Sequence, residues 1–264
     1  MSILDDEVKK DNKVQKIINN GAEIAGAAVG GALGFLAGDP GTAALLALGG
    51  GLAGKALKKI GIEISERLLG SREKTRVGAV IAIAANKIKE RIEEGESIRD
   101  DDFFVVKKNG RTKADEVIEN VIQKCQRDPE EKKIGYMGLL LANIAFDKSI
   151  SVELAHIVIK TVEILTFRQI CILSVAGGKE KEALRSVNYR EEKEFPRELY
   201  QVLHECFDLY SRSLINFKGT AALGLTDVLP SAMTVQGVGV DMYNNLELYR
   251  MPLNEKLDII KILV

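Results

Sequence analysis

The residues that could perform catalysis are few, and their spacing matches no catalytic motif. The two histidines, His156 and His204, lie in apolar stretches, and neither has a second His or Cys three or four residues away in a metal-binding arrangement. His204 is followed by Glu205 and Cys206, but neighbouring residues of a helix point to different faces. The sequence also lacks the Gly-x-Ser-x-Gly turn that presents a nucleophilic serine. We therefore expect a protein that is not an enzyme.

The remaining polar patterns indicate neither phosphate nor metal chemistry. The glycines at 49–51 are followed by Lys55, without the Ser or Thr that binds magnesium in a nucleotide-binding loop. Asp100, Asp101 and Asp102 lack the alternating spacing and the distal glutamate of a calcium loop, which favours exposed, helix-capping carboxylates over a metal site. We expect no metal ion and no cofactor.

The cysteines and the composition favour a cytoplasmic protein. Cys125, Cys171 and Cys206 are odd in number, widely separated and set among apolar residues, so we expect buried, reduced thiols. The first 20 residues are polar, unlike a secretory signal peptide. The net charge of −1 gives the chain no overall attraction to nucleic acid, and we expect no direct nucleic-acid binding.

The most informative pattern is a row of glycines, Gly26, Gly30, Gly34 and Gly38, at every fourth residue of an uncharged stretch. In a helix these positions lie one above the other and form a single smooth stripe. Each glycine costs about 1 kcal/mol of helix stability relative to alanine. Close helix–helix contact in or near lipid recovers that loss. The stripe therefore predicts a surface for membrane contact and self-association.

The uncharged stretch predicts a helical hairpin rather than one membrane-spanning helix. Ile24–Gly38 and Pro40–Gly54 each hold 15 uncharged residues, and the sequence Gly-Asp-Pro-Gly where they meet is typical of a turn. As a helix, each arm would reach about 22 Å, which is short of the hydrocarbon core of about 30 Å. Gly50 and Gly54 continue the small-residue face in the second arm.

Positive charge flanks this hairpin on both sides and suits ends that stay on the cytoplasmic side, beside anionic lipid. From residue 55 to residue 94 the sequence has ten Lys and Arg against six Asp and Glu. The cations that we expect to dock on anionic lipid are Lys55, Lys58, Lys59, Arg72, Lys74 and Arg76. A close-packed Gly/Ala hairpin in the interior of a soluble protein is the alternative.

The elements that position these residues are helices. Apolar residues recur every three or four positions along most of the chain, and no convincing run alternates like a strand. The sequence predicts an all-α fold with a glycine-rich hairpin near the N-terminus. We expect three parts: residues 1–94 with the hairpin and basic helices, 95–150 with a linker and a helical pair, and 151–264 with a helical domain.

Several helix boundaries can be read directly. Thr112 with Asp115 three residues later resembles a capping box, and Thr166 opens another helix. Asp128 followed by Pro129 predicts a further start. Other expected features are a start at Ser151, a long helix from Pro196 to Phe217, an apolar segment from Val77 to Ala85 that packs against the hairpin, and a segment from Phe103 to Val106 that folds back onto the body.

The last third predicts a small winged-helix-like unit. A long helix, a short irregular or β segment and a helix opened by Thr234 follow one another, and Leu165–Gln169 would supply a helix-turn-helix corner. A duplex reader normally needs a basic stripe. Residues 151–249 instead hold ten Lys and Arg against thirteen Asp and Glu, which favours protein contact over DNA reading.

Two resemblances to known families connect these patterns to a function. Residues 22–54, with the motif GxxxGxxxGxxxG, resemble the glycine-zipper hairpins of bacterial membrane-associated proteins. YMGLLLANIAFDKSIS, EILTFRQICIL and LPSAMTVQG together resemble Abi-alpha-type proteins of bacterial abortive infection. The first resemblance implies insertion or self-association. The second implies a role in antiviral defence beside a nucleic-acid-guided sensor protein that is encoded nearby.

Together, the patterns and resemblances predict a membrane-active effector of prokaryotic antiviral defence. We expect it to rest in the cytoplasm, to be released by its sensor partner, and to depolarise the inner membrane by inserting and oligomerising through the glycine stripe. Two alternatives remain open at this point. One is a soluble all-α interaction or adaptor protein whose hairpin is core, and the other is a winged-helix regulator.

Overall fold

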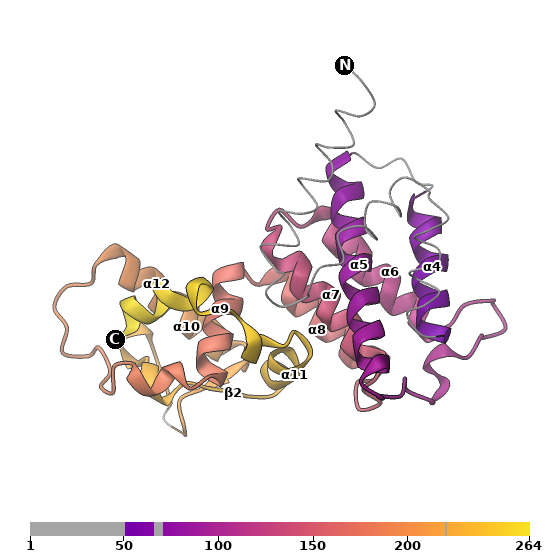
Figure 1. The fold of residues 1–264 in the computed structure, drawn as a ribbon. Coiled ribbons are helices and arrows are strands. Elements are labelled where there is room, and N and C mark those ends of the chain that lie inside the picture. Colours follow the sequence, from indigo (N-terminus) through magenta and orange to yellow (C-terminus); the bar gives the residue numbers. More distant parts are fainter. Residues whose placement is uncertain (1–50, 66–70, 220) are drawn as a thin grey trace, which may run out of the picture. The chain divides into compact units, whose positions relative to one another are not determined.

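The protein is described by a computed structural model, which covers residues 51–65, 71–219 and 221–264 (Figure 1). Over these residues the chain forms nine α-helices and two very short strands, which confirms the all-α prediction. Its contacts divide it into two compact units that meet between residues 163 and 164. This division differs from the three ranges expected from the sequence, because the helices on either side of residue 94 share one core.

The described part of the first unit holds five α-helices and one short 3-10 helix. α5 is the longest of them and packs against α4, α6 and α7. In chain order the elements are α4 (Gly51–Ser65), α5 (Ser71–Glu93), η1 (Asp102–Phe104), α6 (Lys113–Arg127), α7 (Lys132–Ile144) and α8 (Val152–Ile164), the last residue of which lies past the unit boundary.

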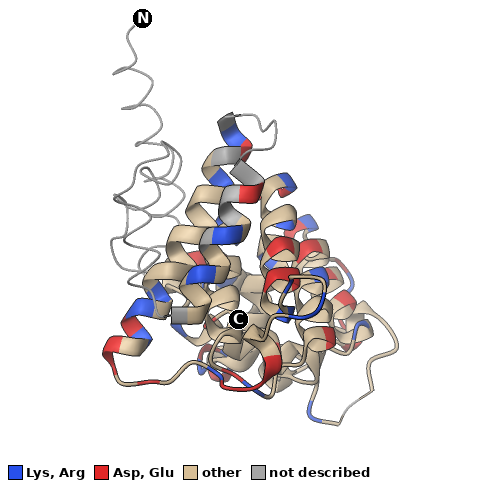
Figure 2. Cartoon of the chain, turned by 90° about the vertical axis from the view of Figure 1, so that its right-hand side faces the viewer, with Lys and Arg blue, Asp and Glu red and all other residues tan. Residues whose placement is uncertain are grey.

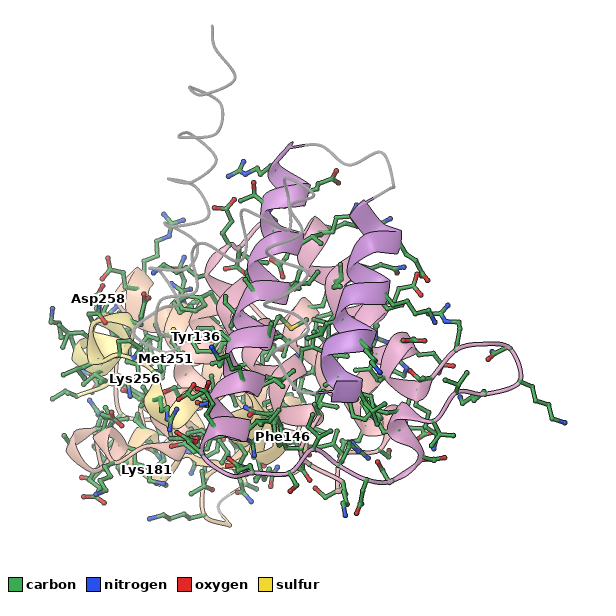
Figure 3. All side chains as sticks on the ribbon, turned by 45° about the vertical axis from the view of Figure 1, so that its right-hand side comes forward. Tyr136, Phe146, Lys181, Met251, Lys256 and Asp258 are labelled. Carbon is green, nitrogen blue, oxygen red and sulfur yellow. The ribbon has the colours of Figure 1, made fainter. Side chains whose placement is uncertain are left out.

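The pairing of α5 with α7 forms the centre of this core. Charged residues lie toward the two ends of α5, and residues 77–86 between them carry no charge (Figure 2). Gly138 of α7 allows a close approach, since a Cβ atom there would lie 2.7 Å from Cγ2 of Ile83. The neighbouring Tyr136 is only 1% exposed (Figure 3). Among the described elements the apolar part of α5 thus packs mainly on α7, and a contact with the hairpin lies outside the described residues.

The predicted capping box at Thr112 and the predicted helix start at Thr166 are both confirmed. At the start of α6, Thr112 Oγ1 accepts a hydrogen bond of 2.9 Å from the Asp115 amide, and the Asp115 carboxylate accepts one of 3.0 Å from the Thr112 amide. Thr166 and Gln169 make the same reciprocal pair at the start of α9. These short-range signals were sufficient because every partner lies within three residues.

The predicted start of α7 was wrong by three residues. The helix begins at Lys132, and its N-cap Glu131 makes no side-chain capping bond. Asp128 instead ends α6, accepts a hydrogen bond of 2.9 Å from the Glu130 amide and pairs with Lys133 at 2.7 Å. The Asp128 carboxylate, which was expected to cap α7, therefore forms an ion pair with Lys133 instead.

The segment that precedes α6 folds back only in part. Phe103 and Phe104 are buried, and the Arg99 guanidinium lies 4.4 Å from the centre of the Phe103 ring. Arg99 also donates to the carbonyls of Ile144, Asp147 and Ile150, which fixes the segment to the end of α7. The next two residues were expected to be buried as well, and this was wrong: Val105 and Val106 are 58% and 66% exposed.

The second unit is arranged around α9, which packs against α10, α11, α12 and the strand β2. The strands pair antiparallel, with Ile215 opposite Val235 and Asn216 opposite Thr234. Its main elements are α9 (Phe167–Gly177), α10 (Arg197–Ser211), β1 (Ile215–Asn216), β2 (Thr234–Val235), α11 (Val238–Asn245) and α12 (Leu253–Leu263). The 3-10 helices η2 (Glu180–Ala183), η3 (Leu225–Asp227), η4 (Pro230–Ala232) and η5 (Leu248–Arg250) connect them.

Two expectations for the second unit were wrong. The helix after Pro196 ends at Ser211 rather than at Phe217, because the chain turns at Ser213 with a φ of 58° and enters β1. Thr234 opens no helix, since it belongs to β2 and donates its hydroxyl to the Asn216 carbonyl across the strand pair.

The two helices of the expected helix-turn-helix corner fall on different sides of the boundary between the units. The proposed helix-turn-helix corner joins α8 to α9, and almost all of α8 belongs to the first unit while α9 belongs to the second. The paired strands that would form a wing hold two residues each. The winged-helix-like unit therefore stays a prediction.

Candidate functional site

Most of the expected membrane surface lies outside the described residues. This holds for Gly26, Gly30, Gly34, Gly38 and Gly50. Gly54 is described, and it is buried in the first turn of α4. Among the described residues, no helix combines the length and the apolar composition that crossing a bilayer requires.

The helix α4 begins within the uncharged stretch from which the hairpin is predicted. Its first four residues are the last four of the uncharged second arm, so no polar linker separates the two. Ala53, Leu57 and Ile60 follow one another along one side of the helix and are at most 2% exposed. They pack within a core in which α4 contacts α5 and α6.

Lys59 holds α4 to the start of α6. Its Nζ atom lies 2.8 Å from Oδ2 of Asp115 and donates a second hydrogen bond of 3.2 Å to the Gly110 carbonyl. The Asp115 side chain is 2% exposed, whereas that of Lys59 is 42% exposed. The same carboxylate oxygen accepts the Thr112 amide, so the ion pair and the capping box form one connected group. Lys59 was expected to dock on anionic lipid, and in the structure it neutralises the buried carboxylate of Asp115.

Two of the expected lipid-docking arginines converge on one carboxylate. Arg72 Nε lies 2.9 Å from Oε1 of Glu131, and a guanidinium nitrogen of Arg76 lies 3.6 Å from the same atom. Arg76 is only 8% exposed and also donates to the Gln126 carbonyl at the end of α6. Docking of Arg76 on lipid would therefore require these interior contacts to break.

The six expected cations thus do not form one uniform exposed surface. Lys55 is exposed, Lys59 and Arg72 are exposed but paired with acids, and Arg76 is buried. The side chains of Lys58 and Lys74 lie outside the described residues. The sequence shows where the cations lie along the chain, but nothing in it indicates which acids neutralise them. These acids are Asp115 of α6 and Glu131 in the turn before α7.

The cysteines agree with the expectation of buried thiols. Cys125, Cys171 and Cys206 are free and buried. Burial raises the pKa of the Cys206 thiol to about 12 and raises that of Cys125 further above its usual range. Such thiols are poor nucleophiles because the reactive thiolate form is disfavoured.

The histidines and aspartates have structural surroundings. His156 Nδ1 lies 2.7 Å from Nδ2 of Asn120, and His204 is exposed on α10. Asp101 accepts a hydrogen bond from the Phe103 amide and so caps η1, as expected of a helix-capping carboxylate. The Arg99 guanidinium lowers the pKa of Asp101. Among the described residues, no group of three or more His, Cys, Asp or Glu could hold a metal ion.

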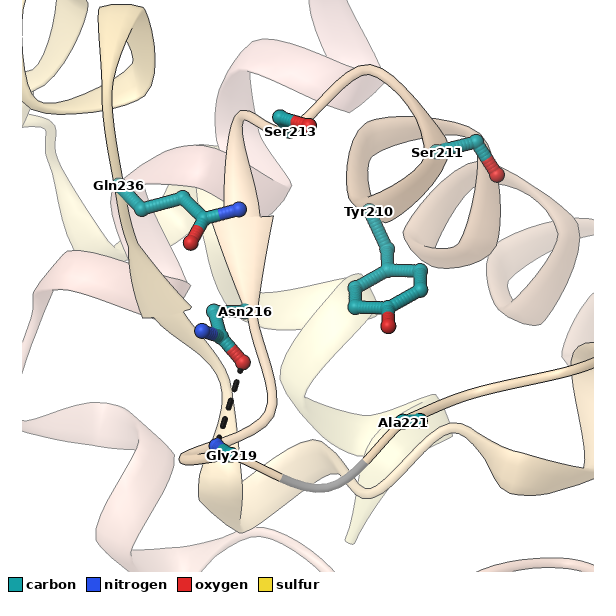
Figure 4. A pocket seen from close by; sticks show the side chains of 7 residues that line it. All are labelled: Tyr210, Ser211, Ser213, Asn216, Gly219, Ala221 and Gln236. Carbon is teal, nitrogen blue, oxygen red and sulfur yellow. Dashed lines mark hydrogen bonds between the residues drawn. The ribbon is translucent and has the colours of Figure 1, made fainter.

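The second unit contains a cavity that the sequence did not indicate. It has a volume of about 450 Å³ and lies between the end of α10 and the strand pair (Figure 4). Its side chains are neutral, which left no pattern of charge to detect. Tyr210 packs against Phe217, with 5.1 Å between ring centres, and its hydroxyl accepts the Ala222 amide. The lining residues are Tyr210, Ser211, Ser213, Asn216, Gly219, Ala221 and Gln236.

Comparisons of the chain with models of protein families, with curated proteins and with solved structures found no match. The candidate site is therefore defined by its own residues alone. Its defining feature is the continuity of the glycine-rich, uncharged stretch with a helix that is packed into the first unit.

Proposed function

We propose that this chain is a membrane-active effector of prokaryotic antiviral defence. Its hairpin, residues 22–54, inserts at anionic membrane and associates with further copies through the glycine stripe, which depolarises the membrane or makes it leak. The single observation that carries this proposal is the uncharged stretch Ile24–Gly54, with a glycine at every fourth position of its first arm. The role in defence comes from the resemblance to Abi-alpha-type proteins.

The attachment of the hairpin supports a release mechanism. Because the second arm continues into α4, any partner that loosens α4 also frees the hairpin. The resting position of α4 depends on the buried residues Leu57 and Ile60 and on the pair between Lys59 and Asp115. A sensor protein that binds this part of the first unit would act as the trigger. Lys55, which is exposed where the hairpin ends, is placed to meet anionic headgroups.

The glycine stripe can be tested by blocking it. The double substitution Gly30→Leu with Gly34→Leu should abolish dye release from vesicles of phosphatidylcholine and phosphatidylglycerol, because two large side chains prevent close helix approach. Release by the wild-type chain should rise more steeply than in proportion to its concentration, because several copies must associate. Release should also be weaker from vesicles of phosphatidylcholine alone, which lack the anionic headgroups.

The matched control is Gly224→Leu in the second unit. A Cβ atom at Gly224 has open space around it, and the φ of −167° is extended backbone that leucine can adopt. This variant should release dye like the wild type. Equal release by the stripe variant and the control would show that the stripe is not the working surface.

A soluble adaptor whose hairpin is core is the second candidate function, and one observation favours it. Gly138 shows that this protein uses glycine for close helix packing inside its own core, against Ile83. Gly54 is likewise buried. Flotation with anionic vesicles separates the two functions, because an adaptor would stay at the bottom of the gradient both with and without its partner.

A further inference from the structure

A short loop of the first unit has features that neither the hairpin nor the helices explain. Residues 105–111 connect η1 to α6 and fold into a fixed turn. The Lys107 amide donates to the Arg111 carbonyl at 2.8 Å, and the Gly110 amide donates to the Lys107 carbonyl at 2.9 Å. Asn109 Oδ1 accepts the Arg111 amide at 3.1 Å, and Gly110 has a φ of 76° that favours glycine.

This loop exposes an apolar pair. Val105 and Val106 are 58% and 66% exposed, although the two residues before them, Phe103 and Phe104, are buried. A single exposed apolar residue is ordinary on a protein surface. Here two exposed valines are adjacent, and Lys107 and Lys108 follow them directly, so apolar surface and positive charge lie next to each other in the loop.

Four cations lie in or beside the loop that carries the valine pair. Lys107, Lys108 and Arg111 follow directly in the loop, and Lys59 of α4 donates to the Gly110 carbonyl. Lys107 and Arg111 contact Glu116 and Glu119 of α6 but keep 43% and 39% of their side chains exposed. Lys108 is exposed as well. Lys108 and the exposed parts of the Lys107 and Arg111 side chains therefore offer positive charge to a negatively charged partner.

We propose that residues 105–111, with Lys59, form a docking surface for an anionic lipid bilayer. Val105 and Val106 enter the interface between headgroups and acyl chains, while Lys107, Lys108 and Arg111 contact headgroup phosphates. The inference rests on the proposed function and adds a first point of contact to it. Since Lys59 joins the loop to α4, docking of the loop also brings the start of the hairpin to the bilayer.

The experiment measures flotation of the full chain in a Gly30→Asp, Gly34→Asp background, because charged residues in the middle of the apolar arm oppose insertion of the hairpin. The vesicles contain phosphatidylcholine and phosphatidylglycerol, or phosphatidylcholine alone. Val105→Ser with Val106→Ser should weaken binding to the anionic vesicles about tenfold through lost apolar burial. Lys107→Ala with Lys108→Ala should weaken it by more than tenfold, since each cation near such a surface contributes about fivefold.

Matched controls come from the second unit. Val187 is 59% exposed and Lys193 is exposed, and Val187→Ser and Lys193→Ala should bind like the background. Circular dichroism spectra and melting curves of every variant check that helical content and thermal stability are unchanged.

Unchanged flotation of both loop variants would overturn the docking surface. Flotation that is equal on neutral and anionic vesicles would do so too. Absence of flotation in the background, while a protein partner protects the loop from hydrogen exchange, would reassign the surface to protein contact. The proposed function is judged separately, by whether dye release depends on the glycines.

Discussion

Replacing Lys133 by methionine should lower the free energy of unfolding of the first unit by about 3–5 kcal/mol, because it leaves a buried carboxylate without its partner. Lys133 is 2% exposed. Its Nζ atom lies 2.7 Å from the Asp128 carboxylate and donates to the Glu163 carbonyl in the last turn of α8 at 3.1 Å. The ammonium group thereby ties the ends of α6 and α8 to the start of α7.

Hydrogen exchange measured by mass spectrometry suits this prediction, since peptides report the two units separately. Exchange should accelerate in peptides of α6, α7 and α8 and stay unchanged in the second unit. The exposed neighbour provides the control, and Lys132→Met should cost less than about 0.5 kcal/mol. Adding Asp128→Asn to Lys133→Met should restore part of the loss, because asparagine is neutral and keeps the oxygen that accepts the Glu130 amide. Equal exchange in the Lys132 and Lys133 variants would contradict the assignment.

Gly239→Ala should destabilise the second unit by about 3 kcal/mol, near the upper end of the usual cost of overpacking. A Cβ atom at this position would collide with the carbonyl oxygen of Leu214 and lie 2.9 Å from its carbonyl carbon. These are backbone atoms, and the same carbonyl accepts the Gln236 amide at 3.0 Å. The backbone on either side of the contact cannot move without opening the junction between β1 and α11.

The control for this prediction is Gly224→Ala, at a position with open space and extended backbone. Peptides of β1, β2 and α11 should exchange faster in the Gly239 variant and at wild-type rates in the control. Exchange that is the same in both variants would show that the second unit absorbs the methyl group without cost.

The fold was predictable from the sequence where the deciding contacts are local. The starts of α6 and α9 follow from Thr112 with Asp115 and from Thr166 with Gln169, each pair only three residues apart. The burial of Leu57 and Ile60 follows from helical periodicity. Local chemistry and tertiary packing agree at these positions.

The wrong predictions lie where a contact between two separate elements determines the local structure. Asp128 reads as a helix cap, but Lys133 and the end of α6 bind it instead. Thr234 reads as a helix start, but pairing with β1 places it in a strand. Such contacts leave no trace in spacing, because they depend on how separate elements meet.

The candidate site shows the same division. Positive charge after the hairpin was visible in the sequence, whereas its neutralisation by Asp115 and Glu131 was not. Val105 and Val106 follow two phenylalanines and were expected to be buried with them, yet both are exposed. The surface that the loop forms with Lys59 could be recognised only once α4 and the loop were seen together.

The most direct test of the account is whether the hairpin enters the bilayer. A single Leu36→Cys substitution between Gly34 and Gly38 can carry an environment-sensitive fluorophore, since the three native thiols are buried and should not react with the label. Leu223→Cys provides the control, because Leu223 is 88% exposed in the second unit.

On adding vesicles of phosphatidylcholine and phosphatidylglycerol, we expect the label at position 36 to brighten, shift to the blue and become shielded from aqueous iodide. The label at position 223 should not change. A label at position 36 that iodide quenches equally with and without vesicles would contradict membrane insertion.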